Sequence, residues 1–191
     1  MKKKYALLQL LICLTSTVAF SQFEKDLSFA NNGDFKFDNS VWHNSINGIF
    51  FNLEDFEELP TGEILLLSNN MNVLKLKPDG TLDTSFSGDG IYEATFPYNV
   101  NGKDLIITPD NKILVAGKGG VTNSFGTNKG ILIRLNADGT LDNTFQDNGS
   151  LVIQTATNNE SINNMIIVGS NLYLAYYKGD ALFSARAYAR L

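Results

Sequence analysis

The sequence predicts an all-β fold built from repeated small sheets, and three observations support this prediction. First, the motif Asp-x-Ser/Thr-Phe-x-x-Asn/Asp-Gly, called the octet below, occurs at 26–33, 83–90 and 142–149, at steps of 57 and 59 residues. Second, short apolar runs bounded by turn-forming residues lie between the octets, as is typical of buried strands. Third, no segment after residue 22 keeps apolar residues at helical spacing through three turns.

The most regular unit of the repeat contains four apolar runs, which are predicted strands at 103–109, 112–117, 130–135 and 150–155. Counterparts elsewhere are the runs at 34–38, 62–68, 72–76, 91–96, 170–176 and 187–191. Four short antiparallel strands per repeated unit are the composition of a β-propeller-like blade. A β-helix is the alternative, but its coils repeat at shorter intervals, and a β-sandwich does not require constant spacing.

The first 21 residues are predicted to be a secretory signal peptide. Three lysines at 2–4 precede an apolar run from Tyr5 to Phe20, and small residues stand at Ala19 and Ser21, the pattern recognised by signal peptidase. A membrane anchor is the alternative, but the run is interrupted by polar residues and is shorter than the roughly 20 residues that a bilayer requires. The sequence therefore predicts a secreted or cell-surface protein, with no membrane span after processing.

Charge and cysteine content restrict the partners of the processed chain. Removal of the leader takes away Cys13, the only cysteine, and three lysines, so the formal net charge changes from −5 to −8. An acidic chain without a basic cluster lacks the electrostatic footprint of a nucleic-acid binder. We therefore expect protein or carbohydrate partners and no nucleic acid.

The processed chain, 22–191, is predicted to be one propeller-like repeat domain of about three blades. It divides into a strand within 22–40 that corresponds to the fourth strand of a blade, a blade at 48–98, a blade at 100–157 and a partial blade at 161–191. Closed propellers have about 4–8 blades, so this domain is incomplete by itself. Two explanations stay open, namely that the chain is a fragment of a longer protein or that two copies form a homodimer with six blades.

A resemblance to a known family supports this architecture. The string LxRLNxDGTLDxTFxxxG, present from Leu132 to Gly149 and in weaker form from Leu74 to Gly90, resembles the bacterial delta-sixty repeat. That family consists of predicted propeller-like repeats in secreted proteins. The resemblance implies a blade architecture and an extracellular location, and it implies no particular catalytic activity.

The repeated residues of the octets are predicted to have structural roles. Their aspartates should accept hydrogen bonds from the Ser or Thr two residues later, and their phenylalanines should fill the gap between neighbouring blades. Lys75, Arg134 and Arg190 occupy equivalent positions and are expected to pair with a repeated carboxylate. The structural set is Asp26, Phe29, Gly33, Asp83, Phe86, Gly90, Asp142, Phe145 and Gly149.

No cofactor is expected, although calcium stays open as an alternative. Asn136, Asp138 and Asp142 place three oxygen-bearing side chains within seven residues. The glycine comes too early, however, for the twelve-residue calcium loop of an EF-hand. Turn formation by the Asp-Gly pair explains the same residues without a metal.

The sequence predicts a binding scaffold without catalytic activity. His43 is the only histidine, and neither a Gly-x-Ser-x-Gly turn nor a zinc ligand set is present, which excludes the common hydrolytic sites. In propellers the loops after the second and fourth strands share one face, and this face would gather aromatic residues for recognition. These candidates are Trp42, His43, Phe96, Tyr98 and Phe125.

Three alternatives to this recognition surface stay open. The loop aromatics could simply pack their loops against the blades. The chain could be a polysaccharide hydrolase or lyase that uses carboxylates near the propeller axis, such as Glu57 and Glu58 in the acidic run 54–58. It could also be a purely structural surface or adhesion component that binds no small molecule.

Overall fold

The computed structural model describes residues 26–34, 52–120, 128–154, 159–178 and 181–190, the last range by its backbone alone. No α-helix occurs in these ranges, and the predicted all-β class is confirmed. None of the described residues forms a helix long and apolar enough to cross a bilayer. The strands are β1 (Leu53–Glu58), β2 (Ile64–Ser68), β3 (Val73–Leu76), β4 (Ile91–Tyr92), β5 (Asn99–Ile107), β6 (Ile113–Gly120), β7 (Lys129–Leu135), β8 (Ser150–Ile153), β9 (Glu160–Val168), β10 (Asn171–Lys178) and β11 (Ala181–Arg190).

The strands form three antiparallel sheets that follow one another along the chain. The first sheet has the order β1-β2-β3-β4, the second β5-β6-β7-β8, and the third β9-β10-β11. Every pairing joins consecutive strands, so each sheet is a meander made by short connections. The predicted blade of four antiparallel strands is thus present twice, and the third sheet has three strands among the described residues.

Tight Asp-Gly turns end the third strand of the first two sheets. Gly80 adopts a φ of 78°, a left-handed conformation that glycine takes without steric cost. The Asp79 carboxylate accepts hydrogen bonds from the backbone N–H and the hydroxyl of Thr81, at 2.9 and 2.6 Å. The same bonds recur at 138–140 with the same lengths, so identical local chemistry produces the same reversal in both sheets.

Two layers of the core lie on either side of the second sheet, and a third, which includes Leu74 and Ile91, packs beside Phe29 on the first sheet. Val115 and Ile131 belong to the layer shared with the first sheet, whereas Leu114 and Leu132 belong to the layer shared with the third. Neighbouring residues of a strand point to opposite faces, so both faces of β6 and β7 are covered. This explains why these two strands are apolar along nearly their whole length.

The first two octets each lie against the Asp-Gly turn of the sheet that follows them. The Ala30 N–H donates to the Asp79 carbonyl at 2.7 Å, and the Ser87 N–H donates to the Asp138 carbonyl at the same distance. Phe86 is buried in the layer between the first and second sheets. The octets therefore connect successive sheets as well as successive strands.

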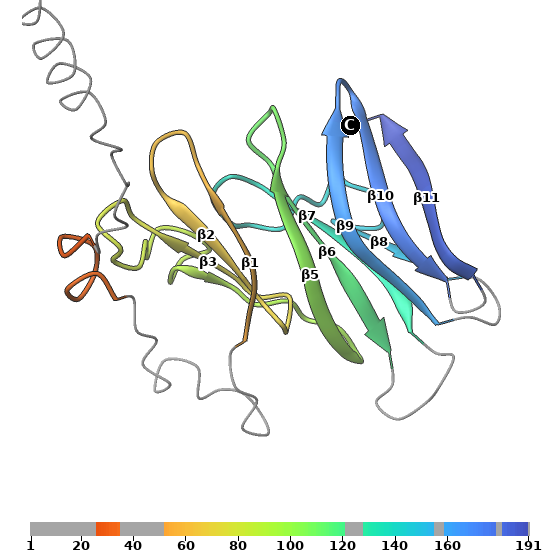
Figure 1. Ribbon diagram of the computed structural model, residues 1–191, viewed down its shortest axis with the longest axis horizontal. Helices are drawn as coiled ribbons and strands as arrows, with labels where there is room; N and C mark the ends of the chain where they lie inside the picture. Colours follow the sequence, from red (N-terminus) through yellow and green to blue (C-terminus); the bar gives the residue numbers. More distant parts are fainter. Residues whose placement is uncertain (1–25, 35–51, 121–127, 155–158, 179–180, 191) are drawn as a thin grey trace, which may run out of the picture.

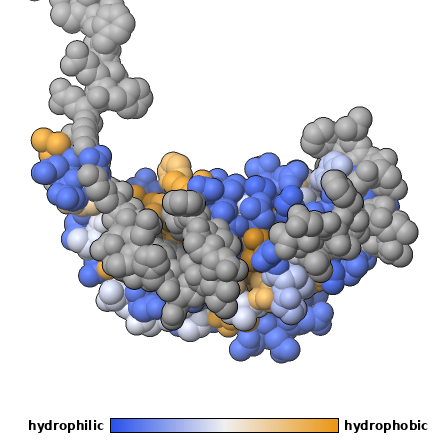
Figure 2. Space-filling model, turned by 90° about the horizontal axis from the view of Figure 1, so that it is seen from below, coloured by the Kyte–Doolittle hydropathy of each residue, from blue (hydrophilic) through white to orange (hydrophobic). Residues whose placement is uncertain are grey.

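The three sheets stand side by side in chain order, with octet 26–33 at one end and β11 at the other (Figure 1). Seen from below, the described part has a crescent outline with one hollowed side (Figure 2). The predicted strand at 34–38 falls almost wholly outside the described residues, as do the predicted signal peptide and residues 35–51.

Candidate functional site

The first strands of the three sheets, called the inner strands below, lie next to one another. β1, β5 and β9 are edge strands of their own sheets, and β5 contacts both β1 and β9. A groove with a volume of about 670 Å³ crosses the C-terminal ends of these strands. Its lining residues are Glu57, Glu58, Pro60, Ile106, Ile107, Thr108, Pro109, Asn111, Met165, Ile166 and Ile167.

The groove combines an apolar wall with an acidic side. Ile166 on β9 is 60 % exposed, so the apolar wall is open to solvent. Glu57 and Glu58 stand on the opposite side, and because strand neighbours point to opposite faces, only Glu57 shares the face of Asp55. The Thr108 hydroxyl donates to Asp110 at 2.5 Å and therefore serves the adjoining turn.

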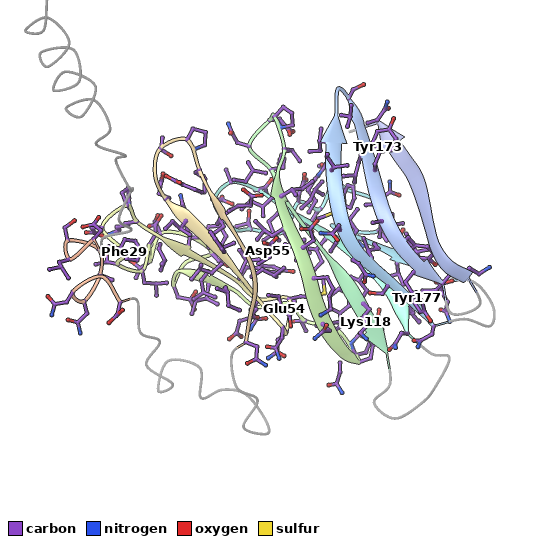
Figure 3. All side chains as sticks on the ribbon, viewed as in Figure 1. Phe29, Glu54, Asp55, Lys118, Tyr173 and Tyr177 are labelled. Carbon is purple, nitrogen blue, oxygen red and sulfur yellow. The ribbon has the colours of Figure 1, made fainter. Side chains whose placement is uncertain are left out.

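Two aspartates join the three inner strands to one another. The Leu105 N–H on β5 donates to the Asp55 carboxylate on β1 at 2.8 Å, and the Met165 N–H on β9 donates to the Asp104 carboxylate on β5. Asp55 and Asp104 occupy equivalent positions in their sheets, so this contact between sheets repeats. A salt bridge of 3.0 Å between Lys103 Nζ and a Glu54 oxygen also joins β5 to β1. Glu54 and Asp55 are labelled on β1 in Figure 3.

The inner strands place three carboxylates close together. Burial raises the pKa of Asp104, the Met165 N–H opposes this, and the neighbouring Asp55 and Glu57 carboxylates add to it, so that the pKa is raised to about 6. Burial, followed by the charge of Asp55, also raises the pKa of Glu57. Among the residues that the structure describes, no group of three or more acidic, histidine or cysteine side chains has a geometry suited to a metal ion.

The octet aspartates make the local hydrogen bonds that their spacing predicts. The Ser28, Ser85 and Thr144 hydroxyls donate to the aspartate two residues earlier at 2.6, 2.7 and 2.6 Å. These bonds lie at the surface or next to the cations described below. They hold the octet in shape, and no octet residue lines the groove.

The cations of the third strands pair with the octet carboxylates. Lys75 Nζ lies 3.4 Å from an Asp83 oxygen and 3.4 Å from a Glu63 oxygen. Arg134 Nε lies 2.8 Å from an Asp142 oxygen. The expected pairing is thus present in both complete sheets, and the Arg190 side chain lies outside the described residues.

The ionised form of Asp142, in the octet that follows β7, is strongly stabilised by its neighbours. The Thr144 hydroxyl, Lys112 and Arg134 hold the pKa of Asp142 well below its usual range. The other two residues considered for calcium also bond to protein donors, since Lys112 Nζ donates to Asn136 at 2.6 Å and Thr140 donates to Asp138. All three oxygen-bearing side chains therefore act within the protein.

Two of the predicted recognition residues come together. The rings of Phe96 and Tyr98 stack with centroids 5.6 Å apart and an interplanar angle of 29°, and Lys129 Nζ lies 5.3 Å from the centroid of Tyr98. Both rings are half-buried. Trp42, His43 and Phe125 lie outside the described residues.

The stacked pair and the groove lie at opposite ends of the inner strands. Tyr98 directly precedes β5, whereas the groove includes Ile106 and Ile107 at the other end of the same strand. The sequence reasoning missed the contribution of Asp104 and of the apolar end of β9. An alignment of the units through Asp55, Asp104 and Asn164 would have found both.

Two segments of the chain, 68–86 and 108–145, match a family described as a domain of unknown function (DUF5122), β-propeller. Both matches end at the phenylalanine of an octet, Phe86 and Phe145. The repeats are β-propeller repeats. The three sheets are accordingly blades, and β1, β5 and β9 are their inner strands. A search of curated proteins finds no match to the chain.

Proposed function

We propose that the protein is an exported propeller scaffold of the delta-sixty type that binds a protein or carbohydrate ligand and catalyses no reaction. The groove across the three inner strands carries this proposal. Propellers present their inner strands and the adjoining turns around the axis, where a rigid concave surface is available to a ligand. The leader-like segment at 1–21 supports export.

The groove suits a ligand that has an apolar surface next to a hydrogen-bond donor or positive charge. The apolar side is formed by Ile106 and by Met165–Ile167, and the acidic side by Glu57 and Glu58. A rigid site on strands loses little conformational entropy when it binds. Peptide segments with basic and aliphatic residues, and sugars that stack on apolar walls, both meet this description.

Binding of the purified protein to a glycan array and to a peptide array tests the proposal. Ile166→Glu should weaken binding of any ligand found by at least tenfold, because it places a charge in the apolar wall at an exposed position. Val152→Glu is the matched control, since Val152 is also exposed and does not line the groove. Equal binding by both variants would refute the groove as the site.

The loop aromatics are a second candidate surface for the same function. Tyr98→Ala tests this surface because Tyr98 stacks on Phe96 and lies under Lys129. Weaker binding with an unchanged melting temperature would favour recognition by the loops. A lower melting temperature with unchanged binding would show that the rings only pack the chain.

The enzyme alternative draws support from the two glutamates of the groove. The raised pKa of Glu57 is suited to a general acid, and Glu58 lines the same groove. Because the two side chains leave the strand on opposite faces, they do not form a facing acid and base pair. Loss of a polysaccharide-cleaving activity in Glu57→Gln, with the activity retained in Ile166→Glu, would establish catalysis in place of simple binding.

A further inference from the structure

The first blade exposes an apolar residue at a position that the other two blades bury. On β1, Leu53 is 51 % and Phe56 is 63 % exposed. Leu105 of β5 and Met165 of β9 occupy the position of Phe56 in their own blades, and they are 0 % and 8 % exposed. Phe56 therefore lies exposed where no preceding blade is described.

Phe56 occupies the position that the preceding blade covers in the other two blades. β1 and β5 pair in the same register, Phe56 with Leu66 and Leu105 with Val115. The Leu105 N–H points away from its own sheet and donates to Asp55 of the preceding blade. By the same geometry the Phe56 N–H points outward, and no described side chain accepts from it.

At the other end of the crescent, Asn164 takes the place of the two aspartates. Asn164 on β9 aligns with Asp55 and Asp104, and it is exposed. An amide oxygen accepts a backbone N–H as a carboxylate does. One end of the molecule therefore presents the outward N–H of this repeated contact, and the other end presents its acceptor.

No strand of the described residues pairs with the outer edge of β11. In the first two blades the fourth strand, β4 or β8, follows directly after an octet and pairs with the third strand. β11 pairs with β10 alone among the described residues, and a free strand edge readily accepts another strand. Octet 26–33 lies at the far end of the crescent from β11 (Figure 1).

We propose that a second copy of this chain docks head to tail, with the β1 end of one copy against the β9–β11 end of the other. The contact continues the interface that already joins β1 to β5 and β5 to β9. It places Phe56 beside Asn164 of the partner and brings octet 26–33 of one copy next to β11 of the other. A head-to-tail contact must close into a ring or extend into a fibre, and two copies of three sheets give six, within the blade number of closed propellers.

The mass of the full chain in solution, measured by light scattering on a sizing column, tests the proposal. We expect the mass of two chains at micromolar concentration. Phe56→Asp should shift the mass to that of one chain, because it would place a charge in the contact. Phe56→Leu, which restores the residue type found at Leu105, should keep two copies.

Cross-linking tests the placement of the contact and does not depend on the folding of Phe56→Asp. In a Cys13→Ser background, a Phe56→Cys chain mixed with an Asn164→Cys chain should form a disulfide-linked pair. A Glu93→Cys chain, whose cysteine is at an exposed position outside the contact, is the control. Mixed with the Asn164→Cys chain in place of the Phe56→Cys chain, it should form no disulfide-linked pair. A wild-type chain of single-chain mass, open-ended assemblies, or equal cross-linking by the control would each overturn the proposal.

Discussion

Asp104→Asn should stabilise the protein at neutral pH, although it removes a charge that holds two blades together. Asp104 is 8 % exposed, and burial raises its pKa from 3.8 to about 6. Ionisation of this group is therefore less favourable in the folded chain than in the unfolded one. Each pKa unit corresponds to about 1.4 kcal/mol, so the ionised carboxylate lowers the free energy of unfolding by at most about 3 kcal/mol above pH 6.

The sign of the pH dependence follows from proton binding. Between pH 3.8 and about 6, folded Asp104 keeps its proton while the unfolded chain releases it. Where the native state binds more protons, stability falls as pH rises. This contribution is fully present below pH 4 and is lost as pH rises through 6. An asparagine lacks the titration, and its amide oxygen still accepts the Met165 N–H.

Urea unfolding at pH 4.5 and pH 7.5, at one fixed protein concentration, measures the effect. The wild type should lose about 2 kcal/mol more than Asp104→Asn between these two values. Glu58→Gln is the matched control, because it also removes one carboxylate from an inner strand but at an exposed position. If Asp104→Asn keeps the wild-type pH dependence, or is less stable than the wild type at pH 7.5, the reasoning is refuted.

Three further predictions concern the contacts between octets and turns. Phe86→Ala should lower the free energy of unfolding by about 3–5 kcal/mol in urea titration, because it empties a fully buried site between two blades. Gly139→Ala should cost clearly more than Gly88→Ala in the same assay, since both have positive φ but an added Cβ lies 2.8 Å from Phe86 only at Gly139; equal costs would contradict the packing role of the turn. Asp142→Asn should flatten the loss of thermal stability from pH 5 to pH 2, because the lowered pKa of Asp142 gives stability that is present above its unfolded value and lost as pH falls; parallel melting curves would contradict this.

The fold could be predicted because its determinants are local in the sequence. Asp142 and Thr144 are two residues apart, and their hydrogen bond forms wherever the octet folds. The Asp-Gly turns and the apolar runs between them are equally local. The constant spacing of the octets then indicates that the same sheet is built repeatedly.

The groove could not be predicted because its contacts join distant parts of the chain. Asp55 bonds to a residue 50 positions later, and Asp104 bonds to one 61 positions later. From the sequence alone, the acidic run at 54–58 indicates no more than carboxylates near the propeller axis. The structure shows that Asp55 has a backbone partner in the next blade, which neither hydropathy nor spacing within one strand indicates.

Equivalent positions of the three inner strands hold Asp55, Asp104 and Asn164, and the change from aspartate to asparagine has a physical reason. Asp104 already lies near the carboxylates of Asp55 and Glu57, and these like charges raise its pKa. A third aspartate at position 164 would add another negative charge next to Asp104 across the same interface. Asn164 retains the hydrogen-bond acceptor without that charge. The repeated position therefore keeps the geometry that joins blades while its charge is limited, and its polar oxygen stays available to a backbone N–H of another chain.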